Sequence, residues 1–187
     1  MTEAASQFAL AYFAVFSRFA GCLMLMPGFS SQRVAMRIRL WITIALTLAL
    51  GPLVYPAVGQ AAAGRNTIGI ATLIISETFI GILFGLTARL ILAAVEMAGT
   101  TIASLIGFGG LPGAPVDGTE PVPALSALIT VTATMLFFVT GLHLLALEGL
   151  VETYRIFPPG AGLDPGRALT IVADQLSATL FLTGKII

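Results

Sequence analysis

The sequence is poor in charge and in the residues from which metal centres and active sites are built. Only 10% of its 187 residues are charged, against roughly 25% in ordinary soluble domains. It has one cysteine, Cys22, and one histidine, His143. A single cysteine cannot form an internal disulfide, and neither residue has a second ligand at a metal-binding spacing. We therefore expect no disulfide, no metal and no cofactor.

Charge of either sign is equally scarce, because nine basic residues balance nine acidic residues. A neutral chain gives no electrostatic reason to bind nucleic acid. The sequence also contains no nucleophile and base at a useful spacing, no paired carboxylates and no H-E-x-x-H motif. Gly107-Phe108-Gly109-Gly110 is glycine-rich, but no phosphate-binding lysine follows it. These absences predict a protein that is not an enzyme.

What the sequence does have is long apolar stretches, with 57% hydrophobic residues and a mean hydropathy of +1.00. A membrane-spanning helix needs about 20 consecutive apolar residues. The pattern predicts one all-α, membrane-associated domain of helical hairpins joined by loops rich in glycine and proline. The predicted helices cover residues 8–26, 40–58, 68–104, 124–155 and 168–183, with a long loop at 105–123.

Proline and glycine punctuate these stretches. Pro27-Gly28 is expected to end the first helix, because proline cannot continue a helix and glycine tolerates the turn. Gly51-Pro52 and Pro56 are expected to kink or end the second helix near residue 58. The chain stops soon after its fifth apolar stretch begins, so we expect it to be incomplete at its C-terminus.

Ionisable residues lie inside or at the ends of the apolar stretches. Such groups are costly in a membrane and usually face protein or a water-filled path. Their presence therefore predicts polar contacts within an assembly or along a conduit. These residues are Arg18, Glu77, Arg89, Glu96, His143 and Glu148.

Glu77, Gly81, Gly85 and Arg89 follow one another at steps of four, so they share one slowly drifting stripe of a helix. Gly81 and Gly85 form a G-x-x-x-G motif, which lets another helix backbone approach closely. Glu77 and Arg89 are about 18 Å apart along the axis and cannot pair with each other. We interpret the stripe as facing a partner subunit or a pore. The alternative is packing between two helices of this chain.

Two further features allow two readings each. The stretch around Phe108 and Leu111 is either a re-entrant loop that occludes a passage or an ordinary exterior loop, because irregular backbone at membrane depth needs shelter. His143 lacks a metal partner, and Glu148 lies on another face of its helix. We interpret His143 as a structural hydrogen-bonding residue rather than a proton relay.

The order of these features resembles the FliR family, a subunit of the flagellar protein-export gate with SctT-like injectisome relatives in type III secretion. The resemblance covers nearly the whole chain and depends on order and spacing rather than on one motif. The residues on which the resemblance depends are Arg18, Pro27-Gly28-Phe29, residues 34–40 (V-A-M-R-I-R-L), Leu50-Gly51-Pro52, Glu77, Gly81, Gly99, Gly107-Phe108, Leu136-Phe137, Gly141-Leu142-His143 and Phe157-Pro158-Pro159-Gly160.

The resemblance implies a non-enzymatic subunit that assembles with FliP- and FliQ-type subunits into a helical export gate. The gate would lie in the bacterial inner (cytoplasmic) membrane at the flagellar basal body, in contact with membrane lipid, and would pass unfolded export substrates. Its helices would form hairpins raised out of the bilayer plane. A further C-terminal region would contact a FlhB-type subunit.

Two roles are expected for named residues: the resemblance implies the first, and the charges and glycines described above predict the second. The central plug of the gate would include Ile106, Gly107, Phe108, Gly109, Gly110, Leu111, Pro112 and Gly113. Subunit interfaces or buried polar contacts would involve Arg18, Glu77, Gly81, Gly85, Arg89 and His143. The alternative function is a self-contained multi-helix transporter or channel, which would favour inverted repeats. No such repeat is visible in the sequence.

Overall fold

The computed structural model describes residues 2–30, 34–107, 124–160 and 170. Over these ranges every regular element is a helix, which confirms the predicted all-α fold there. Three helices are long and apolar enough to cross a membrane, and the last two together form a possible broken span. The helices are α1 (Thr2–Leu25), α2 (Met36–Ala62), α3 (Thr67–Leu105), α4 (Ala124–Val139) and α5 (Leu142–Ile156).

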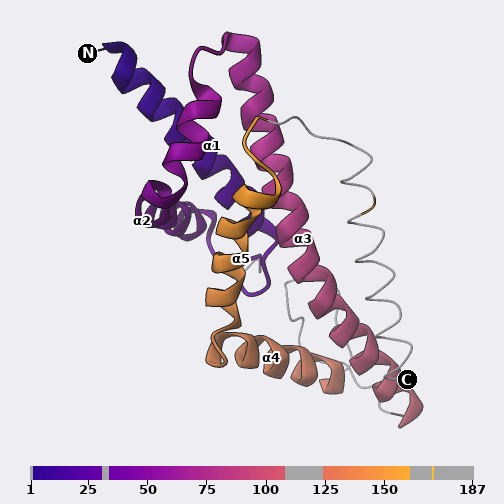
Figure 1. Ribbon diagram of the computed structural model, residues 1–187. Helices are drawn as coiled ribbons and strands as arrows, with labels where there is room; N and C mark the ends of the chain where they lie inside the picture. The colour runs from indigo at the N-terminus through magenta and orange to yellow at the C-terminus, as the bar shows by residue number, and fades with distance from the viewer. Residues whose placement is uncertain (1, 31–33, 108–123, 161–169, 171–187) are drawn as a thin grey trace.

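The longest helix, α3, is the element against which α1 and α4 pack (Figure 1). Its 39 residues correspond to about 58 Å at 1.5 Å per residue. Helix α1 makes the most extensive contacts with it, and α2 packs mainly on α1. Helix α4 crosses the later part of α3, and α5 turns back from the end of α4 toward α1 and α2 (Figure 1). Since a hydrocarbon core is about 30 Å thick, α3 is too long for one upright span.

The second helix runs through its prolines instead of ending near residue 58. Pro52 and Pro56 both lie inside α2, which continues to Ala62. Its buried positions recur every three or four residues on both sides of the prolines, so one face stays packed along its length. Those positions are Thr43, Thr47, Gly51, Val54, Val58 and Ala62. Packing of this continuous face outweighs the two lost backbone hydrogen bonds, as is common in apolar helices with close neighbours.

The stretch predicted as one helix over residues 124–155 is two helices that meet at a corner. Helices α4 and α5 are bent by 67° relative to each other. Gly141 lies at the corner with φ of +75°. This left-handed conformation is easy for glycine and interrupts the helix. The sequence pattern missed the break because a lone glycine between apolar residues is also compatible with a continuous helix.

Only some of the other predicted helix boundaries can be compared with the structure. Asn66 begins α3, because its side-chain oxygen accepts a hydrogen bond from the Gly69 backbone N–H at 2.9 Å. Helix α3 ends at Leu105, close to the expected start of the loop. Residues 108–123 of that loop and the predicted helix at 168–183 lie outside the described part of the chain, apart from Thr170.

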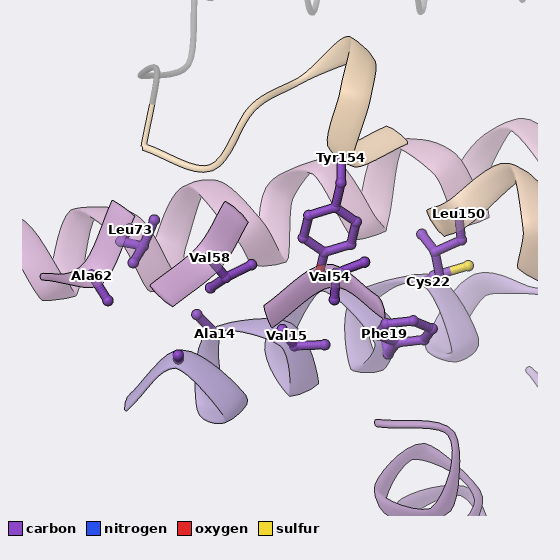
Figure 2. Close-up of a cluster of buried hydrophobic side chains, with 11 residues drawn as sticks. Ala14, Val15, Phe19, Cys22, Val54, Val58, Ala62, Leu73, Leu150 and Tyr154 are labelled. Carbon is purple, nitrogen blue, oxygen red and sulfur yellow. The ribbon is translucent and has the colours of Figure 1, made fainter. Parts of the chain in front are cut away.

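The hydrophobic core lies where α1, α2, α3 and α5 meet (Figure 2). Helix α1 contributes the largest share, and Val54 and Val58 of α2 cover it from one side. Leu150 and Tyr154 bring α5 onto the same cluster. The core is therefore built from helices that are far apart in the sequence. Its buried members are Ala11, Ala14, Val15, Phe19, Cys22, Val54, Val58, Ala62, Leu73, Leu150 and Tyr154.

Candidate functional site

The centre of the molecule holds an ion pair between α1 and α3. Arg18 and Glu77 are both completely buried. The Arg18 Nε donates to Glu77 Oε2 at 2.7 Å, and Nη2 donates to Glu77 Oε1 at 2.9 Å. Two parallel bonds between a guanidinium and a carboxylate give both strength and a defined orientation. The pair fixes the register between two helices that are separated in the sequence by α2.

The remaining donors of Arg18 reach α5. Its Nη1 donates to Thr153 Oγ1 at 3.0 Å, and Nη2 also donates to the Phe157 backbone oxygen at 3.3 Å. The guanidinium carbon lies 3.7 Å from the centre of the Tyr154 ring, a cation–π contact. One arginine side chain therefore joins α1, α3 and the C-terminal end of α5.

A second guanidinium holds the chain just after α5. Arg65, in the turn between α2 and α3, donates from Nη2 to the Gly160 backbone oxygen at 3.1 Å. Gly160 has φ of +77°, a conformation that glycine adopts without strain. Together with the Phe157 contact, this bond sets the direction in which the chain leaves α5.

Glycines allow α1 and α3 to approach closely at the ion pair. A Cβ atom at Gly81 would overlap the Arg18 carbonyl oxygen, and one at Gly85 would lie 2.5 Å from the Cys22 carbonyl oxygen. From the opposite side, a Cβ atom at Gly21 would lie 2.6 Å from the Thr78 carbonyl oxygen. The G-x-x-x-G motif thus serves backbone-to-backbone packing. The close approach also brings the Arg18 and Glu77 side chains within reach of each other.

This arrangement changes the interpretation of the stripe formed by Glu77, Gly81, Gly85 and Arg89. In place of the expected partner subunit, α1 of the same chain covers its first three positions. The physical reason is Arg18, which supplies the opposite charge that Glu77 requires once buried. Arg89 is exposed, and only this last position of the stripe is available to another molecule.

Arg89 lies at the edge of a cavity of about 450 Å³ between α3, α4 and the turn that follows α1. Its Nη1 donates to Ser30 Oγ at 3.2 Å. Glu96, two helical turns further along α3, also lines the cavity. The opposite wall is largely apolar and includes Met135 and Phe138 of α4. This cavity therefore combines two opposite charges with an apolar surface.

His143 contributes little to either site. It is half-buried at the start of α5, and its ring centre lies 5.3 Å from that of Phe138. Its Nδ1 is buried and has no hydrogen-bond partner among the described residues, in contrast to the hydrogen-bonding role expected from the sequence. Glu148 is exposed and lies on a later turn of the same helix.

The predicted plug begins where α3 ends. Ile106 is 57% exposed and follows the last helical residue, and Gly107 turns the chain with φ of +79°. Phe108, Gly109, Gly110, Leu111, Pro112 and Gly113 lie outside the described residues. The plug assignment therefore stays a prediction.

Sequence reasoning found both members of the ion pair but not their pairing, nor Thr153, Tyr154 and the Phe157 carbonyl. A threonine, a tyrosine and a backbone oxygen carry no sequence signal for binding an arginine. Gly21 could have been found from the sequence, because it is a glycine that lies one helical turn after Arg18 on α1. Among the described residues no three histidine, cysteine, aspartate or glutamate side chains are grouped to hold a metal. The buried network is built to hold helices together.

Comparison with known proteins agrees with the resemblance noted in the sequence. The family model described as "Bacterial export proteins, family 1" matches residues 9–187. The flagellar biosynthetic protein FliR of Caulobacter vibrioides is 30% identical over 146 residues, which cover 77% of this chain. The chain spans 57% of the length of that relative.

The ion pair predicts an asymmetric response to substitution. Glu77→Gln or Arg18→Met alone should lower the free energy of unfolding by about 3–5 kcal/mol, because each leaves a buried charge without its counterion. The double variant Arg18→Met/Glu77→Leu should lose much less free energy of unfolding than the sum of the two single losses, since it leaves no buried charge. Unfolding of the purified protein in detergent measures all three. Additive losses would show that the two side chains are not energetically coupled.

The glycine contact predicts a steric effect that depends on position. Gly81→Ala should destabilise the protein by about 1–3 kcal/mol, because the new methyl group overlaps the Arg18 carbonyl and overpacks the α1–α3 contact. Gly59→Ala is the matched control, since its Cβ atom would lie 3.4 Å from the Tyr55 ring, an ordinary contact. Thermal unfolding of the two variants compares them. Equal stability would mean that α1 and α3 are further apart than the structure shows.

Proposed function

Because the chain belongs to the family of bacterial export proteins, family 1, we propose that it is a non-enzymatic subunit of the flagellar-type (type III) protein-export apparatus. The observation that carries this proposal is the family match over residues 9–187. The relative in Caulobacter vibrioides is named for flagellar biosynthesis, which favours the flagellar system. The subunit would act in the bacterial inner membrane at the flagellar basal body.

The proposed partners are FliP- and FliQ-type subunits, together with a FlhB-type subunit. Large apolar side chains are exposed on the outer faces of the helices, including Trp41 at 69%, Leu53 at 68% and Val139 at 81%. Exposed apolar surface of this extent needs lipid or other subunits to cover it. An assembly of apolar helices at the membrane provides both. In this proposal the buried network gives the subunit a fixed shape, and its outer faces make the contacts.

The proposed mechanism is gating by the loop that follows α3. The loop would plug the export pore at rest, with bulky apolar groups such as Phe108 and Leu111 sheltered from water by neighbouring subunits. Its glycines would absorb the backbone change when unfolded export substrates pass. The left-handed backbone of Gly107 is compatible with this proposal, because it ends α3 where the loop begins.

Assembly is the first test. The chain expressed with FliP- and FliQ-type subunits should be recovered from membranes in a stable complex with them, because its exposed apolar faces are then covered. The same chain expressed alone should be recovered from membranes in much lower yield, because only detergent then covers its apolar faces. Affinity purification followed by mass measurement gives the composition of the complex. A monodisperse single chain that ignores both partners when they are present would contradict the proposal.

The plug is tested separately. Deletion of residues 109–113 should leave complex assembly unchanged but let small ions or solutes pass through the resting gate. Conductance of cells that carry the variant complex, measured without active export, is the readout. The parent complex, measured in the same cells, is the control and should not leak. A complex that assembles with the shortened loop and stays as tight as the parent would rule out this loop as the plug.

A further inference from the structure

We propose that the cavity beside Arg89 is the docking site for a helix of another subunit. This helix is apolar on the side that meets α4. On the side that meets α3 it carries an acidic residue opposite Arg89 and a basic residue opposite Glu96, about two helical turns apart. The inference rests on the proposed function in one respect, because it takes the helix from another subunit of the same apparatus.

The α4 wall of the cavity is an apolar stripe that the described part of the chain leaves uncovered. Val131, Met135 and Val139 all line the cavity of about 450 Å³. They recur at steps of four, so they share one face of α4. Although they line a cavity, their exposed fractions are 43%, 65% and 81%. Exposed apolar side chains grouped in this way are typical of a surface that a partner covers.

The α3 wall of the cavity carries two charges that lack counterions among the described residues. The only hydrogen bond of the Arg89 guanidinium there is to Ser30 Oγ, although it has five N–H donors. Glu96 is half-buried, and its carboxylate has no hydrogen bond or ion pair to any residue that the structure describes. A partner that covered both residues without opposite charges would bury two unpaired ions, which is strongly unfavourable. The occupant therefore brings an acidic group to Arg89 and a basic group to Glu96.

The lengths of the two walls fit a helix. Val131 and Val139 are about 12 Å apart along α4, and Arg89 and Glu96 are about 10.5 Å apart along α3. Both spans equal about two helical turns. A small zwitterion could pair with the charges but would leave most of the apolar stripe exposed. A wholly apolar helix would cover the stripe but leave the charges unpaired. A helix that is apolar on one side and carries the two charges on the other satisfies both walls.

Cross-linking identifies the occupant. The full chain is expressed with FliP- and FliQ-type subunits and with a diazirine amino acid in place of Met135. After illumination, mass spectrometry should find a cross-link to one helix of another subunit, with an acidic and a basic residue about two turns apart. Leu53 is the control position, since it is 68% exposed on α2 and does not line the cavity. The same replacement at Leu53 should not reach that helix.

Charge reversal tests the pairing. Arg89→Glu should lower recovery of the complex about tenfold, because two like charges then face each other in the cavity. Arg89→Lys keeps the charge and should retain most of the recovery. Reversal of the acidic residue on the cross-linked helix should restore recovery with Arg89→Glu, which a variant that merely failed to fold could not show. Arg155→Glu is the matched control, since Arg155 is exposed and pairs with Glu152 outside the cavity. It should leave recovery unchanged.

Two results would overturn the assignment while the proposed function stands, because a complex still forms in both. The first is full recovery of the complex in both Arg89→Glu and Glu96→Arg, which would show that the two charges meet no partner. The second is a cross-link from position 135 to a lipid, or to a helix without the two charges. If the parent chain forms no complex with the two subunits, the proposed function fails, and the source of the helix fails with it.

Discussion

An arginine buried among apolar helices determines how α1, α3 and α5 meet. Arg18 cannot leave its charge uncompensated in such surroundings, because the desolvation cost of a lone buried ion is several kcal/mol. Glu77 compensates the charge, and Thr153 and the Phe157 carbonyl take up the remaining donors. Gly81 removes the side chain that would keep α1 and α3 apart. Helix packing and charge compensation therefore depend on each other. The glycines let α1 and α3 approach, and the ion pair stabilises the two helices at that distance.

This constraint divides the molecule into two parts with different chemistry. Where α1 and α5 lie against the first half of α3, the two buried charges, Arg18 and Glu77, are paired with each other. Beyond residue 88, α3 carries Arg89 and Glu96 beside a cavity, and α4 is its main neighbour. The first part is a rigid support. The second part, which ends where the loop after Leu105 begins, carries two charges that have no ion pair with any described residue.

Much of this organisation could be predicted from the sequence, because apolar length and proline–glycine punctuation directly indicate apolar helices. The sequence also identified Arg18, Glu77 and the G-x-x-x-G motif as unusual. It did not identify Arg18 as the partner of Glu77, since the two lie 59 residues apart and pairing depends on tertiary packing. The break at Gly141 was missed for a related reason. Its left-handed backbone depends on where α5 packs against the other helices, and the local sequence does not indicate that packing.

The distance along the chain between Arg18 and Glu77 has a consequence for how the protein is made. At about 5–20 residues per second, the ribosome needs roughly 3–12 s to synthesise the 59 residues that separate them. During that interval α1 has emerged with a charged side chain and no counterion. It must wait at the lipid–water boundary or within the insertion machinery until α3 follows. Entry of α1 into hydrocarbon ahead of α3 would leave Arg18 without its counterion, so insertion of the two helices together is energetically favoured.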